Sequence, residues 1–400
     1  MKVFLLANSF PHEKNKASGI FNYRMVKQMR QMGQEVFVVF FRILLPGRKV
    51  ISSYYYDNIK VTTVCLPLVP IDNYFFLRIN NLICGFLGWK ILKRELMTCD
   101  IIHSVYLTNN GVSGALWAKK LKIPHISQAI GSDVNSDMLK MAKSATFQRS
   151  IEKIDGIITN SKDLERGIKR LYSNLPEIRT IYRGVYVEEL SDSISDKNWT
   201  NGVTFLFLGG LNPYKRLKYG VNTKGGVTLM KSWKMVENEM ALGEAKLFFG
   251  GPYSTNNKLC DKWRFSLKYP QNVELIGEID PSDVKKYLEK SNMVVIPSME
   301  EGLPNFLLES YASAKPAIGS NAGGIPEVIV NLKTGFIFEK GNVDQLAQLL
   351  MQAAADRQNN KQMGERAYNR VKTYFNADSY SKDIVNFYRN LVKKCVGLQE

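Results

Sequence analysis

A chain of 400 residues, with 45% hydrophobic and 23% charged residues, has the composition of a folded protein and is long enough for two domains. Its longest apolar runs have the length of strands and fall short of the roughly 20 residues that cross a bilayer. Its five cysteines are scattered and form no CxxC pair, which favours reduced thiols in a cytoplasmic protein over a disulfide framework or a zinc site. The net charge of +17 fits an anionic membrane, a phosphorylated substrate or a plain solvated basic surface; without a nucleic-acid-binding motif, we predict no nucleic-acid partner.

The first half of the chain alternates apolar runs with helical patterns. We interpret the first run as a strand and not as a signal peptide, because it is only about five residues long and no cleavage site follows. In the next segment Phe21, Met25, Met29 and Met32 share one helical face, and Gly33 favours a helix end. The expected strands of this half are Val3–Ala7, Val36–Phe41, Ile101–Tyr106, Ile157–Thr159 and Ile178–Tyr182.

The segment Tyr74–Leu96 mixes large apolar residues with Arg78, Lys90, Lys93 and Arg94. Such a segment can lie in a membrane interface beside anionic lipid. It can equally be a core helix with a basic rim. The sequence leaves both interpretations open.

A second series of apolar runs follows the polar stretch Ser191–Gly202, which we interpret as a linker. Continuous apolar strands separated by helices indicate parallel sheets covered on both faces. We therefore predict two doubly wound α/β domains, residues 1–195 and 202–375. The expected strands of the second are Val203–Gly210, Ala245–Gly251, Val273–Ile279, Asn292–Ser298 and Pro316–Asn321.

Ligands of parallel sheets bind at the carboxyl ends of the strands, and several of these ends carry glycine pairs. Gly209 with Gly210, and Gly323 with Gly324, can bring backbone amides close to an anion. Glycine also ends strands for steric reasons alone. The GxGxxG fingerprint of NAD enzymes is absent.

The stretch EEGLPNFLLE places Glu301 in a loop after a strand and Glu309 in the second turn of a helix that Pro304 starts. A carboxylate accepts hydrogen bonds from the paired hydroxyls of a sugar or a ribose. The plain alternative is a loop charge and a helix-surface charge. Against it, Glu309 follows Leu307 and Leu308 in an apolar turn, where a charge needs a partner.

Residues 297–328 resemble the signature of the retaining family 4 glycosyltransferases, which have the GT-B fold. The matching positions are Pro297, Ser298, Glu301, Gly302, Glu309, Gly323, Gly324, Ile325, Pro326 and Glu327. The resemblance extends more loosely to the first helix, to IPHISQAIGSDVN and to IYRGVYVEEL. It implies a C-terminal helix, residues 376–400, that packs on the first domain.

The resemblance also implies a role for each matching position. Glu301, with the backbone of Gly302 and Leu303 next to Pro304, would hold the donor sugar, and Glu309 would hold the ribose. The main chain of Gly277, Glu278 and Ile279 would face the base, and Gly19 would approach the diphosphate.

Two positions depart from the family pattern. Where relatives carry an arginine after the first strand of the second domain, this chain has Gly210, and Arg216 is its candidate replacement. Lys215 and Lys224 are rival diphosphate ligands, and Lys224 is preferred because it opens the next helix. Where many relatives have a histidine on the sugar, this chain has Ile130, which leaves Asp133 as the polar candidate, with His103 as a second.

We therefore expect a metal-independent, retaining glycosyltransferase that needs no cofactor. Its predicted partners are a nucleotide-sugar donor, UDP-linked or GDP-linked, a saccharide or lipid-linked acceptor, and an anionic membrane surface. Surface polysaccharide synthesis in bacteria, at the inner face of the membrane, is the expected setting. A nucleotide-sugar epimerase and a non-enzymatic basic membrane-binding protein are the alternatives.

Overall fold

The computed structural model describes residues 1–16, 18–70, 73–142, 144–191, 202–211, 222–239 and 245–397. The chain divides into two compact units, Met1–Tyr182 with Asp378–Glu400, and Arg183–Ala377. The division after Tyr182 comes earlier than the expected boundary at residue 195. Most of the expected linker, residues 192–201, lies outside the described residues.

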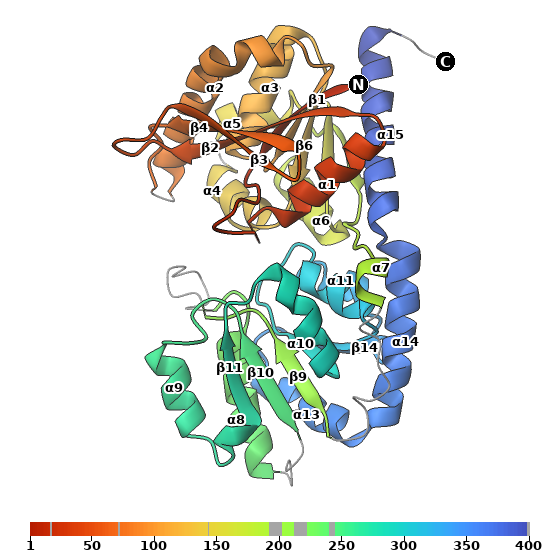
Figure 1. Cartoon of the computed structure of the whole chain (residues 1–400). Helices are drawn as coiled ribbons and strands as arrows, with labels where there is room; N and C mark the ends of the chain where they lie inside the picture. Colours follow the sequence, from red (N-terminus) through yellow and green to blue (C-terminus); the bar gives the residue numbers. More distant parts are fainter. Residues whose placement is uncertain are drawn as a thin grey trace. The chain divides into compact units, whose positions relative to one another are not determined.

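The first unit is a sheet of eight strands with helices in the connections (Figure 1). Its strands are β1 (Lys2–Ala7), β2 (Glu35–Ile43), β3 (Ile51–Tyr56), β4 (Ile59–Leu66), β5 (Ile101–Val105), β6 (His125–Ala129), β7 (Gly156–Thr159) and β8 (Glu177–Thr180). Its helices are α1 (Ile20–Gln31), α2 (Tyr74–Leu96), α3 (Asn109–Leu121), a π-helix (Asp133–Met138), α4 (Leu139–Met141), α5 (Ala145–Ile151), α6 (Lys162–Leu171) and α15 (Ala377–Val396).

The strand order in this sheet is β3-β4-β2-β1-β5-β6-β7-β8, and every pairing is parallel except that of β3 with β4. The chain winds outward from β1 through β2 and then returns to β5 on the other side of β1. The carboxyl ends of β1 and β5 therefore form the topological switch point, where ligands of open α/β sheets bind.

The sequence analysis did not predict three strands of the first unit, β3, β4 and β6. The hairpin of β3 and β4 turns at Asp57 and Asn58, whose φ angles of 46° and 59° match a two-residue type I′ turn. Strand β6 lies in the segment IPHISQAIGSDVN and was not predicted, because His125, Ser127 and Gln128 make a fully buried strand look polar.

The second unit is a sheet of six strands, all parallel, in the order β11-β10-β9-β12-β13-β14. Its strands are β9 (Thr204–Phe207), β10 (Lys246–Gly250), β11 (Val273–Gly277), β12 (Met293–Ile296), β13 (Ala317–Ser320) and β14 (Gly335–Phe338). Its α-helices are α7 (Glu188–Ser191), α8 (Gly226–Glu239), α9 (Lys258–Phe265), α10 (Val284–Lys290), α11 (Asn305–Ala312), α12 (Ile325–Val328), α13 (Val343–Ala355) and α14 (Arg357–Tyr374). Its switch point lies between β9 and β12. Two doubly wound sheets, one entirely parallel and one parallel except for the β3–β4 pair, confirm the predicted fold class.

The last helix, α15, belongs to the first unit. Its apolar face, with Ile384, Phe387, Tyr388 and Leu391, is buried in the core around β1, β5 and β6. Each such side chain contributes about 1.5–3 kcal/mol by leaving water. Polar contacts fix its position: the Tyr380 hydroxyl accepts a hydrogen bond of 2.8 Å from the Gln128 side chain in β6.

Helix α2 has the bounds of the segment that the sequence singled out, Tyr74–Leu96. It packs on α3, where the indole of Trp117 donates a 2.8 Å hydrogen bond to the carbonyl of Gly85, and a Cβ at Gly88 would clash with the same ring. By length and composition alone this helix is apolar enough to cross a membrane, which corrects our expectation that no segment approaches that limit. Its buried face nevertheless forms part of the core of the first unit.

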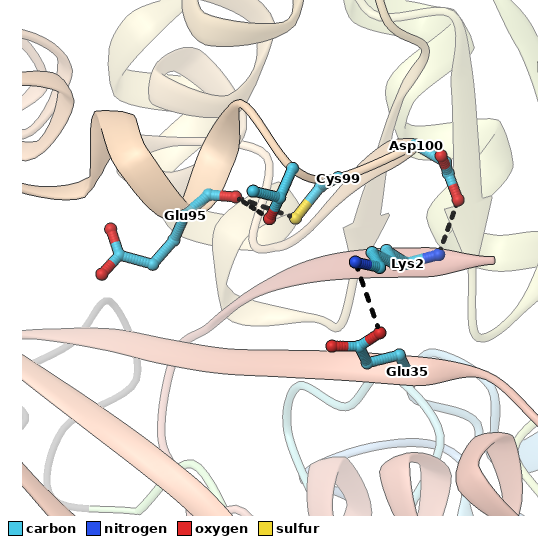
Figure 2. A network of polar contacts seen from close by, with 6 residues as sticks. Lys2, Glu35, Glu95, Cys99 and Asp100 are labelled. Carbon is cyan, nitrogen blue, oxygen red and sulfur yellow. Dashed lines mark hydrogen bonds and ion pairs between the residues drawn. The ribbon is translucent and has the colours of Figure 1, made fainter.

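A network of polar contacts connects the amino ends of neighbouring strands in the first sheet (Figure 2). The backbone N–H of Lys2 donates to Asp100 (2.7 Å), and the Lys2 ammonium lies 3.7 Å from Glu35. The thiol of Cys99 donates to the carbonyl of Glu95 at the end of α2. These contacts join β1, β2 and the α2–β5 turn, at the edge opposite to the carboxyl ends where ligands bind.

Candidate active site

The predicted donor site lies at the carboxyl ends of β9 and β12, the switch point of the second sheet. Two loops meet there: residues 222–225, which lead into α8, and residues 297–304, which lead from β12 into α11. The backbone N–H of Met299 donates a 2.8 Å hydrogen bond to the carbonyl of Thr223. Gly225 has φ +77°, and a Cβ there would lie 1.7 Å from the carbonyl oxygen of Pro297. Only glycine permits this contact.

An ion pair joins the two loops. The ammonium Nζ of Lys224 lies 2.6 Å from the carboxylate Oε2 of Glu301, which also accepts a 3.4 Å hydrogen bond from the Ser298 hydroxyl. The Glu301 side chain is 13% exposed and the Lys224 side chain 49% exposed. The carboxylate is therefore held nearly out of water, while the ammonium remains accessible to a ligand.

The glycine loop after β13 fixes the backbone of Glu301 from the other side. Gly323 has φ +52°, and a Cβ there would lie 1.9 Å from the carbonyl oxygen of Glu301. The N–H of Gly324 donates to the carbonyl of Gly302 (2.9 Å), and the Ser320 hydroxyl donates to the carbonyl of Ser298 (2.6 Å). The two halves of the family-like signature therefore form one structure around Glu301.

The remaining glycines bring strand ends together. The N–H of Gly210 donates to Gly250, and a Cβ at Gly209 would lie 2.8 Å from the Cβ of Lys224. In the loop predicted to face the base, Gly277 is buried and accepts a 2.7 Å hydrogen bond from Gly251. Beside it Glu278 is exposed and Ile279 half-buried.

Helix α11 carries Glu309 in its second turn, as expected, although Pro304 is its N-cap and Asn305 its first helical residue. Leu303, before the cap, is buried, and Glu309 is half-buried between the buried Leu308 and Ser310. Lys215 and Arg216 lie outside the described residues. Lys224, the preferred one of the two rival lysines, lies against Glu301.

Two predicted residues lie in the first unit. Gly19 is the N-cap of α1 with φ +67°, and a Cβ there would lie 2.4 Å from the carbonyl oxygen of Ser9, beyond the end of β1. Its closeness to the β1 end fits a backbone that lies along a ligand.

Asp133 has a different environment from the one we predicted. It is fully buried; one carboxylate oxygen accepts from the N–H groups of Ile130 and Gly131, and the other accepts from the N–H of Leu107. Burial raises the pKa of Asp133, and its backbone hydrogen bonds oppose that shift. This geometry assigns Asp133 to ordering the loop after β6 and not to a contact with the sugar.

His103, the second candidate, is also buried. Its Nδ1 is hydrogen-bonded to the hydroxyl of Tyr388 in α15, and burial lowers the pKa of His103 to about 3. A neutral histidine that anchors the last helix is a structural residue.

The sequence analysis missed a polar pocket of about 270 Å³ at the switch point of the first sheet. It is lined by Asn8 after β1, by Tyr106, Thr108, Asn109 and Asn110 after β5, by Asp137 of the π-helix, and on an apolar side by Phe41 and Leu68. No lysine or arginine is among its described lining residues. The signal was available in VYLTNN, where polar residues follow a buried strand directly.

This pocket carries two conformations that are uncommon outside functional sites. Tyr106 has a backbone φ angle of +90°, which residues other than glycine rarely adopt. Asp137 comes from a π-helix, a form that recurs at binding sites. The buried Oδ1 of Asn109 has no hydrogen-bond partner within the described part of the chain.

Among the described residues, no three His, Cys, Asp or Glu side chains are grouped so that they could hold a metal ion.

Comparison with known proteins decides the family. The model of glycosyl transferases group 1 matches residues 195–370, and the model of glycosyltransferase family 4 matches residues 18–189. The chain belongs to the group 1, family 4 glycosyltransferases.

The similarity to individual members is distant but extends along the chain. An uncharacterised glycosyltransferase of Methanocaldococcus jannaschii is 28% identical over 280 residues, 70% of this chain and 72% of that protein. The UDP-Gal:alpha-D-GlcNAc-diphosphoundecaprenol alpha-1,3-galactosyltransferase of Escherichia coli is 23% identical over 317 residues, 76% and 78% of the two chains. The structure of HepE from Anabaena in complex with UDP matches with a TM-score of 0.72 at 17% identity, over 98% of this glycosyltransferase and all of that chain. The fold is GT-B, as the resemblance implied.

Proposed function

We propose that this glycosyltransferase transfers a sugar from a UDP-sugar, with retention of anomeric configuration and without a metal ion, to a saccharide acceptor carried on a lipid. The observation that carries the proposal is the ion pair of Lys224 and Glu301 at the switch point of the second sheet. It places an accessible ammonium beside a shielded carboxylate. A donor with a charged diphosphate and a neutral sugar requires such a pair of groups.

The donor roles follow from this arrangement. Lys224 and the N-terminus of α8 bind the diphosphate, whose negative charge grows as the anomeric bond breaks. Glu301, with Gly302 and Leu303 beside Pro304, holds hydroxyls of the sugar, and Glu309 holds the ribose. The backbone of Gly209, Gly210 and Gly19 lies along the diphosphate, where Lys215 and Arg216 are further candidates; that of residues 277–279 faces the base.

The reaction breaks the bond between the anomeric carbon and the phosphate oxygen and forms a bond from that carbon to an acceptor hydroxyl. If the acceptor attacks from the face that the diphosphate leaves, the leaving phosphate oxygen takes the acceptor proton. No protein nucleophile is then needed. The chain supplies positioning and electrostatic stabilisation, which are the largest contributions that a site of this kind can make.

The acceptor side rests on the polar pocket of the first unit. Its amide, hydroxyl and carboxylate groups suit a neutral saccharide, and the absence of cations among its described lining residues disfavours a phosphate. A lipid carrier is suggested by the relative whose name includes a diphosphoundecaprenol acceptor. Surface polysaccharide synthesis is suggested by a relative from Staphylococcus aureus that is named for capsular polysaccharide biosynthesis. UDP is suggested by HepE, which was crystallised with UDP and with UDP-glucose.

The test is incubation of the purified chain with a panel of UDP- and GDP-sugars, with and without a lipid-linked saccharide extract, in the presence of a chelator. We expect release of UDP that depends on the extract, and a product whose anomeric proton coupling matches that of the donor. Interconversion of donor epimers without acceptor would indicate an epimerase. GDP release, an inverted product or dependence on a divalent ion would each refute the corresponding part of the proposal.

A further inference from the structure

The exposed side of the first unit beyond β2 and β4 has an unusual surface. Between β2 and β3 the chain forms a projecting loop in which residues 43–53 are all exposed. Its tip is a four-residue turn, with the N–H of Arg48 donating to the carbonyl of Leu45, Pro46 at the second position and Gly47 at φ +77° in the third. This is the type II turn that Pro-Gly favours.

Apolar side chains flank the turn where polar ones are usual. Leu44, Leu45, Val50 and Ile51 are 37–48% exposed. Arg48 and Lys49 lie between them. Scattered apolar residues on a surface are ordinary, but a contiguous exposed group around a rigid turn is typical of a contact surface.

Helix α2 continues this surface. Along its exposed side Phe75, Leu82 and Phe86 are 61–66% exposed. Arg78 lies between Phe75 and Leu82, and Lys90 and Lys93 follow Phe86 at helical spacing; all three basic residues are exposed as well. The Lys90 ammonium lies 4.5 Å from the ring centre of Phe86, so cation and aromatic ring form one amphipathic unit.

Hydrogen bonds place the loop and the helix on the same side of the unit. The N–H of Leu44 donates to Leu66, and that of Cys65 donates to Val50, so the loop lies against the end of β4. From there the chain reaches Val69, whose backbone N–H and C=O both bond to the Asn80 side chain in α2. Figure 1 shows the β2–β3 connection and α2 on one flank of this unit.

The charge of this region selects the partner. From residue 36 to residue 96, the end of α2, the chain carries eight basic residues (Arg42, Arg48, Lys49, Lys60, Arg78, Lys90, Lys93 and Arg94) and three acidic ones (Asp57, Asp72 and Glu95), a net charge of +5. Asp57 is 3.2 Å from Lys27, an ion pair within the same unit. Exposed aromatic and aliphatic groups among cations fit a surface that is both anionic and apolar just below its charges.

We propose that the β2–β3 loop, residues 43–51, and the exposed side of α2 together bind the surface of an anionic lipid bilayer. Leu44, Leu45 and Phe86 enter the interface, and Arg48, Lys49, Arg78 and Lys90 contact lipid phosphates. The proposal depends on the surface alone and stands whether or not the proposed reaction is correct. If both are correct, a lipid-linked acceptor reaches the polar pocket from the same side, since Phe41 of β2 and Leu68 after β4 form the apolar wall of that pocket.

The experiment is sedimentation of the full chain with vesicles of phosphatidylcholine alone or mixed with about one third phosphatidylglycerol. We expect binding to the anionic vesicles only, and loss of most of it in about 1 M salt, where the Debye length is about 3 Å. A variant with Leu44→Ser, Leu45→Ser, Arg48→Ser and Lys49→Ser should partition at least 25-fold more weakly, because each cation near the surface contributes about fivefold.

A matched control changes two exposed apolar and two exposed basic residues on α9 of the second unit: Lys258→Ser, Leu259→Ser, Lys262→Ser and Phe265→Ser. This variant should bind vesicles as the wild type does. Both variants should keep the wild-type melting temperature, and UDP release with a detergent-solubilised acceptor should be unchanged in the loop variant. No binding of the wild type at low salt, or equal binding of the loop variant and the control, would overturn the proposal. Self-association of the wild type that the loop variant abolishes, without vesicle binding, would make this surface an interface between copies of the chain.

Discussion

The two sheets of this glycosyltransferase offer the same topological position twice, and the side chains there differ in kind. At the β9–β12 switch point an accessible lysine pairs with a shielded carboxylate among glycines that bring backbone to backbone. At the β1–β5 switch point amide and hydroxyl side chains line a pocket without a described lysine or arginine. The fold gives both sheets the same position for a ligand; under the proposed function, the different side chains select a charged diphosphate at the β9–β12 switch point and a neutral polyol at the β1–β5 switch point.

The strongest test of this contrast is to remove the positive charge of Lys224 at the β9–β12 switch point. Lys224→Met should lower kcat/KM by about a thousandfold, because a preorganised group aimed at charge developing in the transition state is worth 10²–10³ in rate. Lys231→Met, at an exposed lysine of α8 seven residues further along the chain, is the control and should change little. A Lys224 variant with near wild-type turnover would remove the basis of the donor assignment.

A second contrast concerns acid. All three histidines of the chain lie in the first unit, and burial lowers the pKa of both His103 and His125 to about 3, with mutual repulsion adding to the shift of His125. Around them lie the Tyr388 hydroxyl, the Ser104 hydroxyl and the Asp155 carboxylate, which accepts from the backbone N–H of His125.

Because the folded pKa values lie below the unfolded value of about 6.5, the unfolded chain binds more protons, and stability is lost as pH falls below about 6.5. From pH 7 to pH 5.5 the two residues together should cost about 3 kcal/mol of the unfolding free energy, all of it in the first unit. Urea unfolding followed at several pH values measures this slope. His103→Asn and His125→Asn should each flatten it, and an unchanged slope in both variants would show that other groups govern acid sensitivity.

The two sheets differ in how much of their structure could be predicted from the sequence alone. In the second sheet, five of the six strands were predicted because they are continuous apolar runs, whereas the short strand β14 was missed. The EGLP and GGIPE segments proved to be adjacent through Gly323 and Gly324. The first sheet was harder to predict. Strand β6 is buried but polar in composition, the β3–β4 hairpin has no glycine at its turn, and the burial of Asp133 depends on backbone amides of Leu107, distant in sequence. Lys224 and Glu301 are 77 positions apart in the sequence, so no local sequence pattern could predict their ion pair.

At the β9–β12 switch point, substitutions of Glu301 and Glu309 should change different kinetic constants. Glu301→Gln removes the ion pair with Lys224 and the grip on the sugar at the moment when the anomeric bond breaks. Misplacement at the reacting centre costs about a hundredfold, so kcat should fall by that factor. Calorimetry should still find wild-type affinity for UDP, which lacks the sugar. Wild-type kcat in this variant would rule out the positioning role.

Glu309→Gln should act on binding instead. A carboxylate that holds the ribose does so equally in the substrate and in the transition state, and loss of such an interaction raises KM without changing kcat. A charge-assisted hydrogen bond weakened by neutralisation costs about tenfold in the KM of the donor. The variant should also bind free UDP about tenfold more weakly, which is the opposite of the result expected for Glu301→Gln. Equal UDP affinity in the two variants would break the division of roles.

The smallest expected effect lies at the first switch point, where two neighbouring asparagines form a matched pair. Both line the pocket. The amide of Asn110 donates to the carbonyls of Ala7 (3.1 Å) and Val105 (2.9 Å) and so ties β1 to β5, whereas the buried Oδ1 of Asn109 has no hydrogen-bond partner among the described residues. Asn109→Ala should leave the melting temperature and the donor KM unchanged and raise the KM of the acceptor about fivefold, the worth of one hydrogen bond of about 1 kcal/mol. Asn110→Ala should lower the melting temperature by several degrees, because it leaves buried carbonyls unsatisfied. Acceptor and donor titrations of UDP release, together with thermal unfolding, measure all three quantities. If Asn109→Ala changed the donor KM and not the acceptor KM, the assignment of the neutral pocket to the acceptor would be wrong.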